Sequence, residues 1–148
     1  MVSKVSESVV KAWGRLMRAQ RSLLERVEGD LKRAGLPPLS WYDVLLELNR
    51  MEEGRLRQFE IGGKVLLSKH NLSRLLDRLE DEGMVKRQSC KEDRRGAHVV
   101  ITRAGRALLK RMWPVYEHAI AEYFGRLLSE EEAERLASLM RRFVGNSA

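Results

Sequence analysis

The sequence has little cysteine, little proline and no long apolar run, and each of these features argues against a particular class of protein. The one cysteine, Cys90, cannot form an internal disulfide, which agrees with a reducing compartment. Three prolines and 33% charged residues argue against a disordered or membrane-embedded chain. The N-terminal residues form no signal-peptide apolar run, and no segment approaches the roughly 20 apolar residues of a membrane span. With 148 residues, 43% of them hydrophobic, we expect a single cytoplasmic domain over 1–148 that is not an enzyme of a recognisable class.

Positive charge is concentrated in one segment of the chain. Between Met84 and Arg111, nine lysines and arginines accompany two acidic residues, and the resulting net charge of +7 equals that of the whole chain. A local field of this size attracts polyanions and makes their binding depend on salt. Charge alone leaves two interpretations equally open, a nucleic-acid surface and a solvated charged face.

Helical spacing of apolar residues predicts long helices at both ends of the chain. In the first, over 5–35, apolar pairs recur about every seven residues between Val9 and Leu31. The second end segment, 106–146, holds two helices. Together the two segments carry more apolar surface than one small domain can cover, which predicts that they form a dimer interface.

Local signals place the ends of these later helices. Thr102 is a predicted N-cap, and Pro114 is expected to kink or interrupt the helix that follows. Residues 129–132, Ser-Glu-Glu-Glu, form a predicted capping box that opens the last helix. A similar box, Ser40 to Asp43, is expected to open a helix in the middle of the chain.

The middle of the chain, 40–104, contains a short amphipathic helix with Ser68 as its expected N-cap. Just before it, Gly62 and Gly63 indicate either an irregular helix or a close helix crossing. The apolar face of the amphipathic helix carries four leucines, and its polar face is basic in the first turns and acidic in the last. Only the first half can approach phosphate without repulsion, as a recognition helix does when it enters the major groove. Its candidate DNA-binding residues are Ser68, Lys69, His70, Asn71, Ser73 and Arg74.

After Gly83, residues 85–89 and 97–101 are predicted to form a β-hairpin whose loop is rich in arginine. An arginine at the tip of such a hairpin can insert into a narrow minor groove, and a nearby aspartate can orient it. The alternative is an ordinary solvated turn, which explains the charges but not their concentration. We call this hairpin and its loop, residues 85–101, the wing. Its candidate DNA-binding residues are Arg87, Lys91, Asp93, Arg94 and Arg95.

Other chemistry is poorly supported by the sequence. His70, His98 and His118 are scattered without metal-ligand spacing, so no metal or other cofactor is expected. Cys90 is more typical of an inert thiol than of a sensor. No nucleophile, base and orienting group come together, and no glycine-rich phosphate loop follows a strand. Five aromatic residues are either core or the lining of an effector pocket, with core the more typical role: Trp13, Trp41, Tyr42, Trp113 and Tyr116.

Residues 65–87, 92–96 and 101–105 resemble the winged helix-turn-helix of the MarR (multiple antibiotic resistance regulator) family, and the long end helices match its dimerisation layout. The resemblance implies a mainly α fold with a small β-hairpin wing and long dimerisation helices. It also implies a homodimeric bacterial or archaeal regulator, often a repressor released by a small phenolic or other lipophilic effector. By position, Lys69, His70, Ser73 and Arg74 would read the major groove, and Asp93 and Arg95 would be the wing aspartate and minor-groove arginine.

Two functions from different classes remain open on this sequence. The first is a regulator that binds an inverted-repeat site in double-stranded DNA as a homodimer and responds to an effector. The second is an architectural or protein-interaction winged helix that binds DNA weakly or without sequence preference. Selective binding to an inverted repeat distinguishes the first from the second.

Overall fold

The computed structural model describes residues 4–65, 67, 69–88 and 97–145. Over these residues the chain is mainly helical, with one small sheet, as expected. The elements are α1 (Glu7–Arg33), α2 (Leu39–Arg50), β1 (Arg55–Arg57), α3 (Gln58–Gly62), α4 (Lys69–Asp81), β2 (Val85–Gln88), β3 (His98–Ile101), α5 (Arg103–Tyr123), a 3-10 turn (Gly125–Leu127) and α6 (Glu130–Val144).

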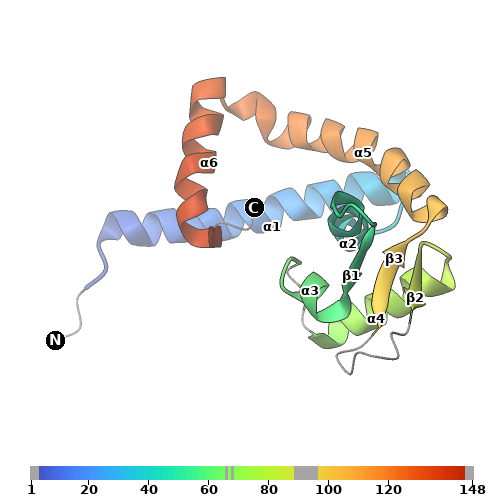
Figure 1. Ribbon diagram of the computed structural model, residues 1–148. Coiled ribbons are helices and arrows are strands. Elements are labelled where there is room, and N and C mark those ends of the chain that lie inside the picture. Colours follow the sequence, from blue (N-terminus) through green and yellow to red (C-terminus); the bar gives the residue numbers. More distant parts are fainter. Residues whose placement is uncertain (1–3, 66, 68, 89–96, 146–148) are drawn as a thin grey trace.

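The elements fall into two groups (Figure 1). The first group is α2, α3, α4 and the sheet, and the second is the end helices α1, α5 and α6. Helices α2, α3 and α4 and the sheet gather near the C-terminal end of α1, and α5 packs on both α1 and α2. Helix α6 follows at the far end of α5, apart from α4 and the sheet, and has at most slight contact with any other described element. None of the described helices combines the length and apolar character that crossing a membrane requires.

A single core holds the first group together. Helix α2 contributes Val44, Leu45 and Leu48, all completely buried, and α5 covers them with Leu108 and Met112. The predicted apolar face of α4 is buried in the same core through Leu72, Leu75, Leu76 and Leu79. Burying leucines of this kind stabilises a fold by about 1.5–3 kcal/mol each, so the position of α4 against the core is firmly fixed.

The sheet confirms the predicted hairpin and adds a strand that the sequence pattern did not reveal. Strands β2 and β3 pair antiparallel, with Val85 opposite Ile101. Strand β1 pairs with the other edge of β3, so the order is β1-β3-β2, and Leu56 lies opposite Val99. Three residues with one apolar side chain are too short to give a recognisable alternation.

Two predicted N-caps are confirmed. The Thr102 hydroxyl accepts a hydrogen bond from the Gly105 amide (3.1 Å) and donates one to the Gly83 carbonyl (2.6 Å), which joins the end of α4 to the start of α5. The Ser129 and Glu132 side chains cap each other's backbone amides at the start of α6. Pro114 does not interrupt α5, which continues through it.

The predicted capping box at Ser40 and Asp43 is wrong. Helix α2 begins at Leu39, and Pro38 in the N-cap position makes no side-chain hydrogen bond. Instead the Leu39 amide donates to Oε1 of Glu28 on α1, at 2.6 Å. The cap is therefore a tertiary contact between α1 and α2, and no local sequence pattern encodes it.

The close backbone approach expected at Gly62 occurs at a different glycine. A methyl group at Gly62 would lie 3.6 Å from Leu72 Cδ2, an ordinary contact that requires no glycine. At Gly105, in the first turn of α5, a Cβ would lie 2.4 Å from the Met84 carbonyl oxygen. The absence of a side chain at Gly105 is therefore what lets α5 approach the turn after α4.

We expect Gly105→Ala to lower the free energy of unfolding by about 2 kcal/mol or more, because a backbone oxygen must move. Gly62→Ala is the matched control and should leave it unchanged or raise it by up to about 1 kcal/mol, since alanine restricts the unfolded chain. Urea denaturation of both variants measures the difference. Equal stabilities would show that the turn after α4 adapts without cost.

Candidate nucleic-acid interface

Helix α4 presents the polar face that the sequence predicts. Its leucines are buried, and His70, Asn71 and Arg74 are exposed on its first two turns. Ser73 is half-buried beside them. Ser68 and the side chain of Lys69 lie outside the part of the chain that the structure describes, so their roles remain expectations.

The charge of this exposed face changes sign along the helix. No acidic residue occurs from 69 to 76, whereas Asp77, Glu80, Asp81 and Glu82 crowd the last turn and its end. A polyanion can therefore approach the first half of α4 but is repelled by the second half, unless nearby cations compensate for these carboxylates.

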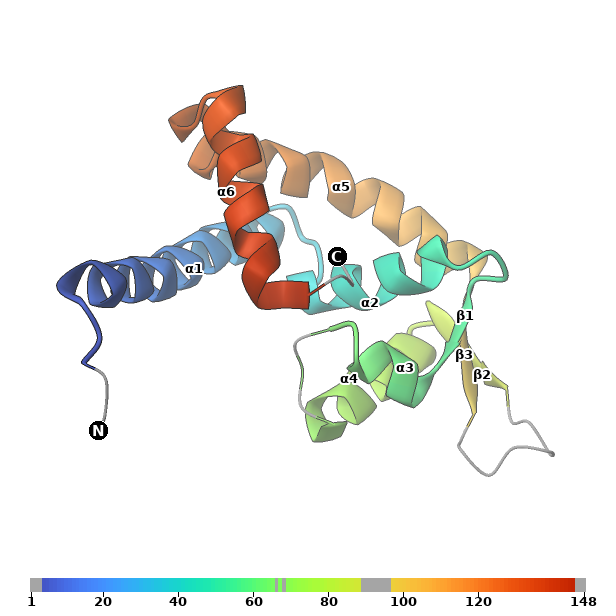
Figure 2. The ribbon, with the colours of Figure 1, turned by 60° about the vertical axis from the view of Figure 1, so that its left-hand side comes forward.

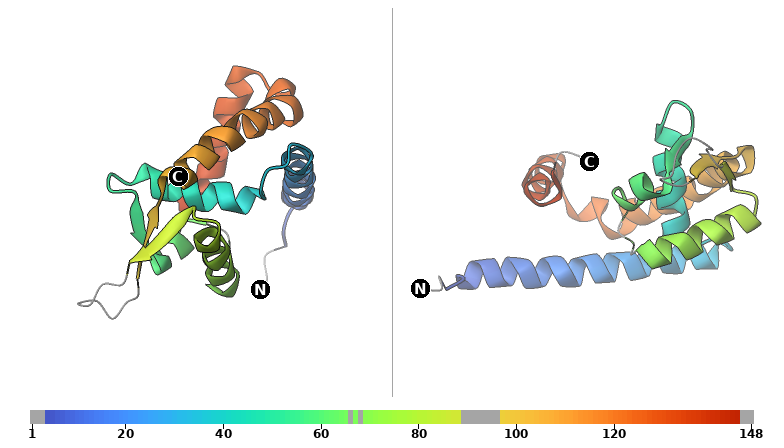
Figure 3. Two further views of the ribbon diagram at one scale, coloured as in Figure 1. Left: turned by 90° about the vertical axis from the view of Figure 1, so that its right-hand side faces the viewer. Right: turned by 60° about the horizontal axis from the view of Figure 1, so that its bottom comes forward.

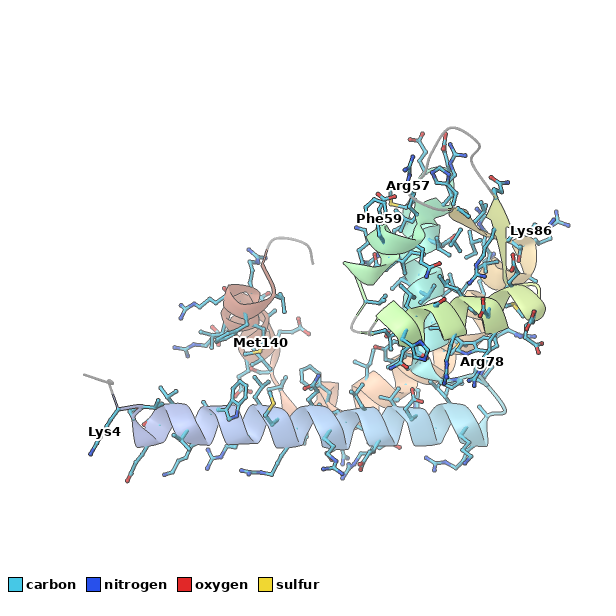
Figure 4. The ribbon with its side chains drawn as sticks, turned by 90° about the horizontal axis from the view of Figure 1, so that it is seen from below. Lys4, Arg57, Phe59, Arg78, Lys86 and Met140 are labelled. Atoms are coloured by element: carbon cyan, nitrogen blue, oxygen red, sulfur yellow. The ribbon has the colours of Figure 1, made fainter. Side chains whose placement is uncertain are left out.

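The wing lies beside this acidic half. Strand β2 runs next to α4 (Figure 3, left). Lys86 on β2 and Arg78 on α4, both labelled in Figure 4, are exposed. The neighbouring residue Arg87 is turned the other way, toward α4, and only 27% of its side chain is exposed. The remaining wing candidates, Lys91, Asp93, Arg94 and Arg95, lie outside the described residues, as does Cys90.

Arg87 contacts α4 at three residues. Its Nη1 is 2.7 Å from Oδ1 of Asp77 and 3.8 Å from Oε1 of Glu80, and its Nη2 donates to the Ser73 carbonyl at 3.4 Å. Its backbone amide donates to Oε2 of Glu80 at 3.0 Å. The basic loop and strand predict a DNA contact for Arg87. Nothing local to β2 indicates that its side chain pairs with carboxylates seven and ten residues earlier.

Three of the five aromatic candidates come together where α2 meets α5. The ring of Tyr42 lies 5.1 Å from that of Tyr116 and 6.3 Å from that of Trp113, and burial raises the pKa of both tyrosines. Trp41 is half-buried against the core. Trp13 is 64% exposed on the N-terminal half of α1 and takes no part in this cluster.

A cavity of about 390 Å³ lies between α1, α2 and the segment that follows α3. None of the five aromatic candidates is among its lining residues, which are Gln20, Leu24, Glu28, Pro38, Leu39, Ser40, Asp43, Val65 and Leu67. Asp43 lines this cavity, and partial burial of its carboxyl group raises its pKa to about 6. Like-charge repulsion from Glu28 and Glu47 adds to the increase. Asp43 follows Tyr42 of the aromatic cluster directly in α2, and its carboxylate also helps to raise the pKa of Tyr116.

Sequence reasoning did not identify this cavity. Its lining comes from three separate parts of the chain, and its two acidic members, Glu28 and Asp43, give no signal by spacing. Among the described residues, no three histidine, aspartate, glutamate or cysteine side chains are arranged to hold a metal ion.

Comparisons with known proteins agree on one family. The sequence profile of the MarR family matches residues 34–96. The chain is 31% identical to the HTH-type transcriptional regulator MhqR of Bacillus subtilis over 97% of its own length and 96% of that protein.

Solved structures agree with this assignment. The MarR-family regulator Sco3205 of Streptomyces coelicolor, solved in complex with DNA, is 26% identical with a TM-score of 0.85, over 95% of this chain and 88% of that one. AbsC, from the same organism, is also 26% identical, with a TM-score of 0.82 over 95% of each chain. The chain therefore belongs to the MarR family of winged helix-turn-helix transcriptional regulators, which bind DNA and are not enzymes.

Proposed function

We propose that this protein is a homodimeric repressor that binds an inverted-repeat operator in double-stranded DNA in the cytoplasm and is released by a small lipophilic effector. The observation that carries the DNA-binding role is the geometry of α4. Its leucine face is fixed in the core, while His70, Asn71 and Arg74 project from an acid-free first half. A relative of closely similar fold has been solved in complex with DNA, which supports the same role for this chain.

Within this surface the residues are assigned different tasks. Arg74 lies toward the middle of the polar face, where its fork can reach a guanine edge, with His70, Asn71 and Ser73 around it. Lys69, at the first turn, and the preceding residue Ser68 are proposed to contact phosphate. On the wing we assign Arg95 to the minor groove, with Asp93 orienting it and Lys91 and Arg94 contacting the backbone.

The dimer is proposed from apolar side chains that the single chain leaves uncovered. Trp13 on α1, Leu127 after α5 and Phe143 on α6 are 64%, 71% and 73% exposed. They belong to the end segments, away from α4 and the wing (Figure 2). A second copy of the chain that covers these segments would present two α4 helices, one for each half-site.

Selection of binding sites from random DNA tests the proposed function. We expect an inverted repeat whose half-site centres lie about one helical turn apart, near 10 base pairs. Arg74→Ala should relax the preference at one base pair of each half-site, because it removes a base contact. Lys69→Ala should weaken all sequences equally and reduce the salt slope by roughly 1 per half-site.

The alternative function is an architectural or protein-interaction winged helix. Recovery of no inverted repeat would favour it over the repressor. An unchanged site preference in Arg74→Ala would remove the base-reading role from that residue alone.

Charge placed in the proposed dimer interface tests the assembly. We expect the double variant Leu136→Glu, Leu139→Glu to be monomeric or aggregated, because two carboxylates would be buried without partners. Ser138→Glu, on the opposite side of the same helix from its apolar side chains, should remain dimeric and serves as the control. Light scattering measures the mass, and a soluble dimer of the double variant would exclude this interface.

The effector is proposed to occupy the cavity between α1 and α2, with the aromatic cluster of Tyr42, Trp113 and Tyr116 beside it and Trp41 close by. Trp13, two turns before Gln20 on α1, is not among the residues that line this cavity. Because Glu28 and Asp43 line the cavity, a neutral ligand should be favoured over an anion of similar shape.

We expect 4-ethylphenol, which is neutral at pH 7, to release the protein from its DNA, and 4-hydroxybenzoate, an anion of similar size, to do so at least about tenfold less well. Ser40→Phe, which fills the cavity, should abolish the response without loss of DNA binding. Fluorescence anisotropy of labelled operator DNA measures both effects. Equal potency of the two phenols would contradict the proposed charge preference.

A further inference from the structure

Arg87 is the basic wing residue whose contacts the structure describes most fully, and its side chain points toward α4. Its guanidinium lies against Asp77 and Glu80 of α4 and donates to the Ser73 carbonyl, and its amide donates to Glu80. A guanidinium whose donors are engaged by protein acceptors has fewer of them left for a phosphate. Lys86, the residue before it, is exposed at the surface.

We infer that Arg87 is a positioning residue that clamps the wing to the recognition helix and does not contact DNA. This inference rests on the proposed DNA-binding function and gives Arg87 a different role from the one expected from the sequence. The planar guanidinium can engage a carboxylate and a carbonyl at once, whereas a lysine ammonium cannot reproduce this fork. Its Nε is buried and without a hydrogen-bond partner within the described structure, so the side chain is held by its two terminal nitrogens.

The clamp has a second consequence, which is electrostatic. Asp77 and Glu80 lie on the half of α4 that would repel the DNA backbone, and Arg87 places a positive charge between them. The wing is thereby held close to α4 by the same charge that reduces this repulsion. Arg87 thus weakens the repulsion between the acidic C-terminal half of α4 and the DNA backbone.

The decisive variant is Asp77→Asn, because a pure effect of net charge and the loss of the Arg87–Asp77 contact predict opposite changes in DNA affinity. If only net charge mattered, removing a carboxylate from a surface that faces a polyanion would tighten binding. If the clamp positions the wing, Asp77→Asn weakens binding by about threefold to tenfold, the range expected for a partly exposed, hydrogen-bonded ion pair.

Asp81→Asn is the matched control. Asp81 carries the same charge one turn further along α4, is exposed, and makes no ion pair with any described residue. This variant should bind as tightly as the original protein or slightly more tightly, by at most about threefold.

Arg87→Lys separates positioning from phosphate contact, because it keeps the positive charge. We expect it to weaken binding to the same extent as Asp77→Asn, with the dependence of the binding constant on salt unchanged. Footprinting should show loss of protection at the flanks reached by the wing, with the sites read by α4 still protected. A merely destabilising change would weaken both regions together.

A measurement without DNA keeps the clamp testable even if the proposed function fails. Hydrogen exchange of the β2 and β3 amides should become faster in Asp77→Asn and Arg87→Lys but not in Asp81→Asn. In a double-mutant cycle, Arg87→Ala and Asp77→Ala should destabilise the fold less together than the sum of their separate effects. If the original protein binds no DNA, the repressor proposal fails, while these two measurements still decide whether the clamp exists.

Three results would overturn the inference. Additive stabilities and unchanged exchange would show that there is no clamp. Binding by Asp77→Asn as tight as that by Asp81→Asn would show that the contact does not position the wing. Arg87→Ala that reduces the salt slope by about 1 per half-site, together with normal binding by Arg87→Lys, would identify Arg87 as a phosphate ligand.

Discussion

Burial of the α4 leucines is the interaction on which the rest of the site depends. Leu76 and Leu79 are completely inaccessible, and Leu72 and Leu75 nearly so, which fixes the rotation of the helix about its axis. Because residues of an α-helix repeat every 3.6 positions, fixing this face also fixes which side chains point outward. The direction of His70 and Arg74 thus follows from hydrophobic packing and not from any contact that they make themselves.

The wing is built onto this fixed helix from two directions. The Thr102 hydroxyl joins the end of α4 to the start of α5 through Gly83, and Gly105 lets α5 approach Met84 closely. On the other side, β1 pairs with β3 and closes the sheet against the core through Leu56. The base of the hairpin is therefore held in three ways: by its chain connections to α4 and α5, by the pairing of β3 with β1, and by the ion pair of Arg87 with Asp77.

Local patterns predicted the elements well because each of their signals is contained in a few consecutive residues. The leucine spacing of α4 and the caps at Thr102 and Ser129 are of this kind. What the sequence could not predict is set by contacts between distant segments. Glu28, eleven residues before Leu39, replaces the local cap expected at Ser40, and β1 is recognisable only by its partner β3. The exposure of Trp13 and the pairing of Arg87 with Asp77 follow from no local pattern either, since a residue's type does not reveal which element its side chain faces.

The contact between Glu28 and Leu39 also joins helix α1 to the core. Helix α1 belongs mostly to the uncovered end segments, and α2 forms the centre of the core that seats α4. Their direct polar link is a carboxylate that satisfies an amide at the start of α2, where the helix dipole favours negative charge. Glu28 and Leu39 both line the cavity. A molecule bound there would therefore touch the junction between the end helices and the core, on the side where α2 begins.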